Sequence, residues 1–119
     1  IGDLSKLEQL NFKANCLRVL PNAIGNLPLL QRLLLGENEL ISMPSSLSRL
    51  QNLEQLDISS NNLGVWSNTR IETFFLSLGK LKNLHSLRLD INPLTHEQKI
   101  MLYRQVPDKK VFQRRNERK

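Results

Sequence analysis

Cysteine is almost absent from this sequence. Cys16 is the only one, so the chain cannot form an internal disulfide bond. Disulfide-stabilised domains are typical of oxidising compartments, whereas free thiols persist in reducing ones. We therefore predict a cytoplasmic protein, with a bacterial secreted or cell-surface protein as the alternative. We interpret Cys16 itself as a small, filling side chain.

The sequence also lacks long apolar runs and the motifs of common active sites. It contains no run of about 20 apolar residues, so no membrane-spanning helix is expected. It has no H-E-x-x-H pattern, no phosphate-binding glycine loop and no nucleophile elbow. The two histidines, His85 and His96, fall in different predicted elements. We therefore predict a non-catalytic protein with no metal site and no cofactor.

What the sequence does contain is a leucine spacing that occurs four times. The pattern is L-x-x-L-x-L-x-x-N-x-L, with Phe12 in place of the third leucine in the first copy and Ile58 in the third. The asparagines of successive copies are 23, 23 and 31 residues apart. Periods of about 20–50 residues are typical of solenoids, in which each repeat stacks on the next.

Apolar residues two apart within each copy predict a short strand with one buried face. The predicted buried pairs are Leu10 and Phe12, Leu33 and Leu35, Leu56 and Ile58, and Leu87 and Leu89.

An asparagine follows each predicted strand. These asparagines are Asn15, Asn38, Asn61 and Asn92. A side-chain amide both donates and accepts hydrogen bonds, so it can satisfy backbone groups of its own turn and of a neighbouring one. We therefore predict a buried, structural ladder; the alternative is that these asparagines are exposed for ligand contact.

The first repeat ends in L-P-x-x-I-G-x-L, from Leu20 to Leu27. Together with the leucine and asparagine pattern, this ending resembles the leucine-rich repeat family, and in particular the 23-residue class of Ras-suppressor-like intracellular proteins and similar bacterial and protist chains. The resemblance implies an α/β fold, a leucine-rich repeat solenoid shaped as a short right-handed horseshoe with parallel strands on its concave side. It also implies protein binding rather than catalysis.

The third repeat is eight residues longer than the first two, which indicates an insertion at about 64–78. Thr69 and Glu72 match a capping box, in which each side chain satisfies a free backbone N–H at the start of a helix. We therefore predict a helix over residues 70–78 on the convex side, ended by Gly79.

The apolar residues of this insertion have helical spacing. They are Ile71, Phe74, Phe75 and Leu78, which predicts that one side of the helix packs on the core. Trp66 stands just before the helix. We interpret it as a lid on the helix; the alternative is an exposed contact with a partner, because tryptophan is enriched among interface hot spots.

The repeat pattern stops after Leu94. Thr95 and Gln98 match a second capping box, so we predict a helix over residues 95–107 that caps the end of the solenoid. Its predicted apolar residues are Ile100, Met101, Tyr103 and Val106. Val111 and Phe112 are expected to add a short extended piece.

We divide the chain into four repeats with the helical insertion (residues 1–94), the capping helix (95–107) and a basic tail (108–119). The tail carries six basic and two acidic residues, and the rest of the chain 11 and 9. Residues 1–6 match the end of a repeat. We therefore expect the sequence to begin within a repeat, with Leu4, Leu7 and Leu10 bordering apolar surface that a preceding repeat would cover.

Alternate residues of each predicted strand point away from the core. On the concave face, the third positions of the repeat are Gln9, Arg32, Gln55 and Ser86, and the fifth positions are Asn11, Leu34, Asp57 and Arg88. Arginine forms directed hydrogen bonds to carboxylates, and a leucine at an outward position supplies an apolar contact. We select Arg32, Leu34, Gln55, Asp57 and Arg88 as the partner-binding residues.

These observations favour a protein–protein interaction module or scaffold that binds a partner protein through the concave sheet face. The alternative is an adaptor whose basic tail docks to nucleic acid or to an anionic surface. The concave columns mix both charge signs with neutral residues, which argues against a nucleic acid lying along them.

Overall fold

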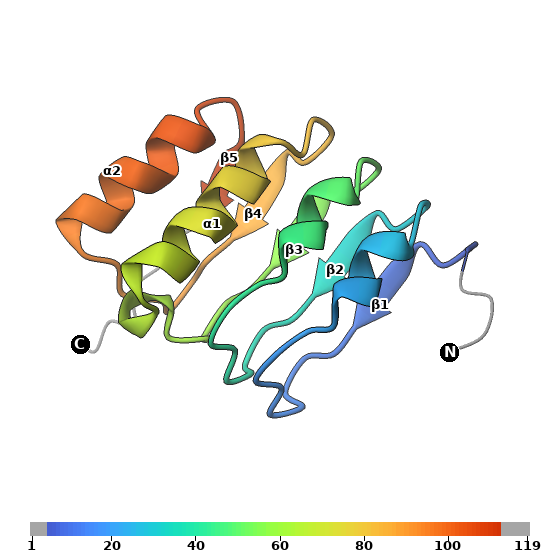
Figure 1. Ribbon diagram of the computed structural model, residues 1–119, viewed down its shortest axis with the longest axis horizontal. Coiled ribbons are helices and arrows are strands. Elements are labelled where there is room, and N and C mark those ends of the chain that lie inside the picture. The colour runs from blue at the N-terminus through green and yellow to red at the C-terminus, as the bar shows by residue number, and fades with distance from the viewer. Residues whose placement is uncertain (1–4, 113–119) are drawn as a thin grey trace.

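One parallel sheet organises the chain. The computed structural model describes residues 5–112. Its strands are β1 (Gln9–Asn11), β2 (Arg32–Leu34), β3 (Gln55–Asp57), β4 (Ser86–Arg88) and β5 (Lys110–Phe112). Each strand pairs in parallel with the next one in the sequence, so the spatial order is β1-β2-β3-β4-β5 (Figure 1). The predicted α/β class and parallel sheet are confirmed.

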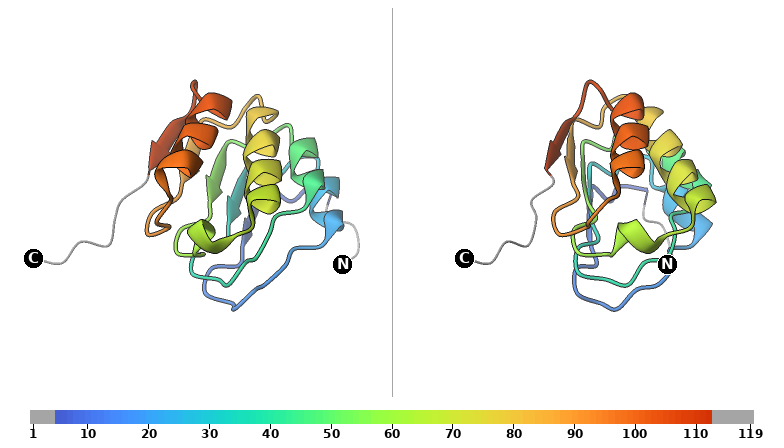
Figure 2. Two further views of the ribbon diagram at one scale, coloured as in Figure 1. Left: turned by 60° about the vertical axis from the view of Figure 1, so that its left-hand side comes forward. Right: turned by 90° about the vertical axis from the view of Figure 1, so that its left-hand side faces the viewer.

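The described helical elements lie on one face of this sheet. They are the 3-10 helices η1 (Asn22–Asn26), η2 (Ser45–Arg49) and η3 (Leu63–Val65) and the α-helices α1 (Asn68–Gly79) and α2 (His96–Gln105). Figure 2 shows the helices on one side and the strands on the other. No helix or strand of residues 5–112 covers the opposite face, which we call the open face.

The core lies between the sheet and the helical elements, and the leucines of the repeat fill it. Leu33, Leu56 and Leu87, in the middle of three successive strands, are at most 1% exposed. The strand register pairs them directly, so they stack at one level. Burying a leucine is worth about 1.5–3 kcal/mol, and this burial requires the neighbouring repeat.

Successive repeats also approach closely on the helical side. A Cβ atom on Gly25 of η1 would lie 2.6 Å from the carbonyl oxygen of Ser46 in η2. The Ser46 hydroxyl donates to the carbonyl of Asn22 at 2.7 Å. The absence of a side chain at Gly25 therefore allows η1 and η2 to pack nearly backbone to backbone.

Asn38, Asn61 and Asn92 form the predicted ladder, and all three are at most 7% exposed. The side-chain oxygen of Asn92 accepts from the backbone N–H groups of Asn61 at 2.9 Å and Leu63 at 3.0 Å. Its amide nitrogen donates to the carbonyl of Ile58 at 2.8 Å. Each asparagine thus satisfies the turn of the repeat before its own.

Asn15 departs from this prediction, because it is exposed rather than buried. Its own backbone N–H and that of Leu17 donate to the side-chain oxygen of Asn38, each at 2.9 Å. Its amide nitrogen donates only locally, to the carbonyl of Lys13 at 3.2 Å. Each buried asparagine bonds to the turn of the preceding repeat, and among residues 5–112 no repeat precedes that of Asn15.

The first strand is also less buried than predicted. Phe12, expected in the core, is 36% exposed, and Leu7 and Leu10 are only partly buried. The reason is that, among residues 5–112, β1 has a neighbouring strand on one side only. The expected apolar border is therefore present at Leu7 and Leu10, while Leu4 lies outside the described residues.

The insertion forms α1, which extends beyond the predicted residues 70–78 at both ends. Ser67 caps it, and the backbone N–H of Arg70 donates to the Ser67 hydroxyl at 3.3 Å. The predicted capping box of Thr69 and Glu72 is wrong, because Thr69 is already inside the helix. The predicted buried side is correct and comprises Ile71, Phe74, Phe75 and Leu78.

Trp66 packs as the predicted lid. It is 6% exposed, and its ring centroid lies 5.6 Å from that of Phe74. Its ring N–H donates to the carbonyl of Leu40 at 2.8 Å, which ties the insertion to the preceding repeat. The alternative of an exposed contact at Trp66 is wrong, because a buried indole offers no surface to a partner.

Gly79 serves close packing rather than a left-handed helix stop. It is the last residue of α1, and Lys80 after it has right-handed helical geometry. A Cβ atom on Gly79 would lie 3.0 Å from the carbonyl oxygen of Gln105 at the end of α2. The glycine thus lets the ends of α1 and α2 approach each other.

The predicted capping box at the start of α2 is confirmed. The backbone N–H of Gln98 donates to the Thr95 hydroxyl at 3.1 Å, and the backbone N–H of Thr95 donates to the Gln98 side chain at 2.8 Å. The helix ends at Gln105, two residues short of the predicted segment 95–107.

The buried side of α2 differs from the prediction at two positions. Ile100 and Tyr103, expected on the apolar side, are 41% and 46% exposed. Val106 is buried as predicted and Met101 is partly buried against the core, while Gln98 and Leu102, which were not predicted, are also buried. The three buried residues, Gln98, Leu102 and Val106, are spaced four apart and form one narrow stripe, because the helix contacts the core along a single line.

After α2 the chain returns to the sheet as β5, so the extended piece expected at Val111 and Phe112 is confirmed. Lys109 anchors it: the side chain is 2% exposed, and its ammonium donates to the carbonyl of Leu81 at 2.9 Å. Residues 113–119 of the predicted tail lie outside the described residues.

The ladder can be tested by Asn61→Ala. This change leaves buried backbone groups without partners, so we expect the free energy of unfolding to fall by about 1–3 kcal/mol, as measured by urea denaturation. Asn15→Ala is the matched control: because Asn15 is exposed, we expect a loss below about 0.5 kcal/mol. Losses of equal size would contradict the ladder.

The packing of α1 can be tested by Phe74→Ala. Phe74 is 1% exposed, so the cavity should lower the free energy of unfolding by about 3–5 kcal/mol. Leu76, on the same helix, is 44% exposed, and Leu76→Ala should stay within about 0.5 kcal/mol. If both variants unfold at the same urea concentration, α1 does not pack on the core.

Candidate functional site

The open face consists of side chains at alternate strand positions, aligned in two rows across the sheet. The first row is Gln9, Arg32, Gln55, Ser86 and Lys110. The second row is Asn11, Leu34, Asp57, Arg88 and Phe112. Adjacent members of a row lie on adjacent strands, which are about 4.8 Å apart in a sheet.

The structure brings the five candidate binding residues together in these rows. Arg32 and Gln55 are neighbours in the first row, and Leu34, Asp57 and Arg88 are consecutive in the second. Arg32 and Arg88 are exposed, and the other three are partly buried. The candidates therefore form one continuous patch on β2, β3 and β4.

The carboxylate of Asp57 is already engaged within the protein. One of its oxygens accepts from the backbone N–H of Ser59 at 2.9 Å and from the Ser59 hydroxyl at 2.5 Å. Asp57 therefore shapes the turn after β3 as well as contributing to the patch.

Arg88 is held in place from two sides. Its guanidinium donates to Asp90 at 2.7 Å in an ion pair, and its central carbon lies 4.3 Å from the centroid of the Phe112 ring. The ammonium of Lys110 lies 5.4 Å from the same centroid. Two cations thus share one aromatic ring at the β5 end of the open face.

Lys110 and Phe112 belong to this face, although sequence reasoning placed them in the tail. The sequence signal was weak, because Val111 and Phe112 are adjacent apolar residues and only Val111 packs against the core. No asparagine pattern accompanies β5, because the chain reaches it from α2 rather than from another repeat.

The titratable residues elsewhere do not converge on a metal-binding geometry. Within residues 5–112, no group of three or more His, Cys, Asp or Glu side chains is arranged to hold a metal ion. His85 is exposed, with its Nδ1 atom 3.3 Å from the carbonyl of Asn83, and His96 begins α2.

None of the helices in the described part of the chain is long and apolar enough to cross a membrane.

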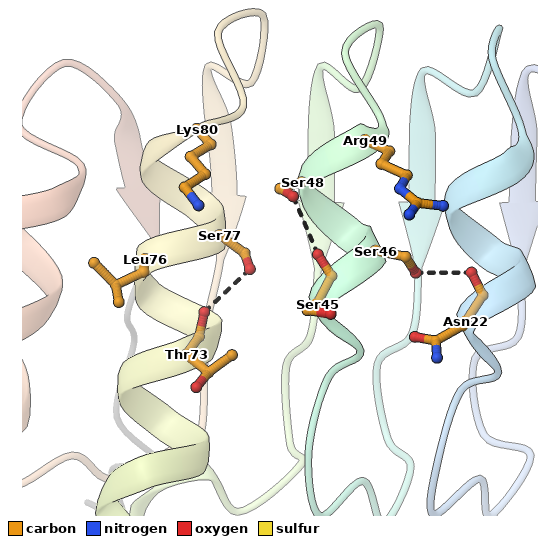
Figure 3. A pocket seen from close by; sticks show the side chains of 9 residues that line it. All are labelled: Asn22, Ser45, Ser46, Ser48, Arg49, Thr73, Leu76, Ser77 and Lys80. Carbon is orange, nitrogen blue, oxygen red and sulfur yellow. Dashed lines mark hydrogen bonds between the residues drawn. The ribbon is translucent and has the colours of Figure 1, made fainter.

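A polar groove lies on the helical side, where α1 runs beside η2 (Figure 3). Its volume is about 490 Å³. Its lining residues are Asn22, Ser45, Ser46, Ser48, Arg49, Thr73, Leu76, Ser77 and Lys80. Three of the hydroxyls donate to backbone carbonyls, those of Ser46, Ser48 and Ser77.

This groove arises because the insertion replaces a short 3-10 turn with the longer helix α1. Arg49 and Lys80 are exposed on its two sides. The Ser48 and Ser77 hydroxyls donate within their own helices, and the Ser46 hydroxyl donates to η1. The groove therefore presents two cations on the side of the molecule away from the open face. Substitutions of these two residues can control for the effect of net charge on binding.

The comparisons with known proteins address the fold. No protein-family model and no curated protein matches the chain. Among solved structures, the chain is similar to a leucine-rich repeat protein of Leptospira interrogans, with a TM-score of 0.63 and 27% sequence identity over 91% of this chain and 31% of that chain. The chain therefore spans about a third of the length of that protein. Together with the parallel sheet and the asparagine ladder, this similarity shows that the fold is leucine-rich-repeat-like.

Proposed function

We propose that the chain is a non-catalytic protein-interaction module that binds another protein through the open face of its sheet. We take this face to be the concave side of a short right-handed horseshoe, with α2 as its terminal cap. A leucine-rich-repeat-like fold is typical of non-enzymatic, protein-binding chains, which supports the proposal in general terms.

The observation that carries the proposal is the continuity of the open face. Five strands present two aligned rows of side chains that no helix or strand of residues 5–112 covers. The strands fix these side chains in position, and preorganised contacts lose less entropy when a partner binds.

The residues that we assign to the contact are Arg32, Leu34, Gln55, Asp57 and Arg88. Arg32 and Arg88 are suited to carboxylates of a partner. Leu34 lies on β2 with Arg32, beside Asp57 of β3, and adds an apolar contact. A cytoplasmic location remains a prediction that follows from the single cysteine.

The contact can be located by photo-crosslinking. A benzoylphenylalanine placed at Gln55, on the open face, should capture the partner protein, and the same group at Ser45, beside the helical groove, should not. The captured protein is then purified for binding measurements.

Charge reversal tests the assigned residues. Arg32→Glu with Arg88→Glu should weaken binding of the captured protein by more than about tenfold, or about 1.4 kcal/mol, in isothermal titration calorimetry. The control, Arg49→Glu with Lys80→Glu, changes net charge equally on the helical side and should bind normally.

The adaptor alternative predicts a different result. If deletion of residues 113–119 abolishes binding while the open-face reversal has no effect, the contact is made by the tail. Circular dichroism of each variant verifies that the fold is retained.

A further inference from the structure

The two rows of the open face carry three cationic side chains, Arg32, Arg88 and Lys110, and one carboxylate, Asp57. Asp57 is engaged by Ser59, and Asp90, in the turn after β4, pairs with Arg88. Arg32 and Lys110 are exposed, and neither takes part in the ion pairs found among residues 5–112. The face therefore favours an acidic partner over a basic or neutral one.

The β5 end of this face has the geometry of a carboxylate site. Arg88 is fixed by its ion pair to Asp90 at 2.7 Å and by the Phe112 ring, and 45% of its side chain is exposed. A guanidinium has five N–H donors, so the single bond to Asp90 leaves donors for a second carboxylate. Lys110, beside the same ring, adds a second positive charge.

Arg32, the other exposed cation of the first row, lies at a defined distance from Lys110. Arg32 and Lys110 belong to the same row, with Gln55 and Ser86 between them. Three strand spacings make this separation about 14 Å. An extended chain rises about 3.4 Å per residue and points alternate side chains the same way, so residues i and i+4 of such a chain match the two cations.

From these observations we propose that the open face binds an extended acidic segment of a partner protein, with Asp or Glu at positions i and i+4. One carboxylate lies at Arg88 and Lys110, the other lies at Arg32, and the residues between them contact Gln55 and Ser86. This inference rests on the proposed function and specifies the chemistry of the partner.

A nucleic acid is a poorer match to the same cations. Single strands are held by bases that stack on aromatic rings. Phe112 is the only aromatic side chain in the two rows, and Arg88 already lies over its ring. The site therefore lacks an unoccupied aromatic ring on which a base could stack, whereas its cationic side chains can bind a carboxylate.

The experiment measures binding of short labelled peptides to the full chain by fluorescence anisotropy. The probe is Gly-Ser-Glu-Ser-Leu-Ser-Glu-Ser-Gly, which has its glutamates four apart. One comparison peptide has the same composition with adjacent glutamates, and another has glutamine at both positions. We expect the probe to bind at least about fivefold more tightly than either comparison, and less tightly as salt rises.

Variants then locate the peptide. Arg32→Gln and Lys110→Gln should each weaken probe binding by about threefold to fivefold, the effect of losing one exposed ion pair. Arg49→Gln with Lys80→Gln, on the helical groove, should bind the probe normally. Deletion of residues 113–119 should reduce affinity less than either open-face variant.

Three results would overturn the inference: equal binding of the glutamine peptide, loss of binding only when residues 113–119 are deleted, or tighter binding of a single-stranded oligonucleotide that depends on Arg32 and Lys110. The proposed function is judged separately. If the peptides fail but a protein still crosslinks through position 55, only the acidic-segment inference is wrong.

Discussion

The pairing of buried backbone groups at the turn after each strand is the constraint on which the structure depends. The residue before each asparagine of the repeat has a positive φ, at Ala14, Glu37, Ser60 and Ile91. A left-handed backbone at a non-glycine residue costs about 1–2 kcal/mol, and it turns N–H and C=O groups away from the sheet. The buried asparagines satisfy these groups and hold each turn against the following repeat.

This constraint also determines what the open face can do. Because every repeat is tied to the next at the same position, the strands pair without a shift in register. The outward side chains consequently align in rows, and charges separated by many residues in the sequence are held at fixed multiples of the strand spacing. The eight additional residues of the third repeat do not disturb this register, because they lengthen the segment that contains α1, on the opposite side of the sheet.

Local patterns predicted the repeated part of the fold well, since each leucine and asparagine has the same environment in every internal repeat. These local patterns failed at the two ends of the sheet, where the neighbouring repeat is absent from the described residues or is replaced by another element. Asn15 and Phe12 match the pattern but lie at the edge of the sheet, where burial depends on what packs beside them. Four of the five positions in each open-face row were predicted on strands and found there, but Lys110 and Phe112 required knowledge that α2 returns the chain to β4.

The most direct test of the ladder is amide hydrogen exchange in Asn92→Ala. The backbone N–H groups of Asn61 and Leu63 donate to the Asn92 side chain, whereas that of Leu17 donates to Asn38. Under native conditions, where exchange reports local opening, we expect exchange at Asn61 and Leu63 to accelerate far more than at Leu17. Uniform acceleration at all three amides, or none, would contradict the account that each asparagine holds the turn of the preceding repeat.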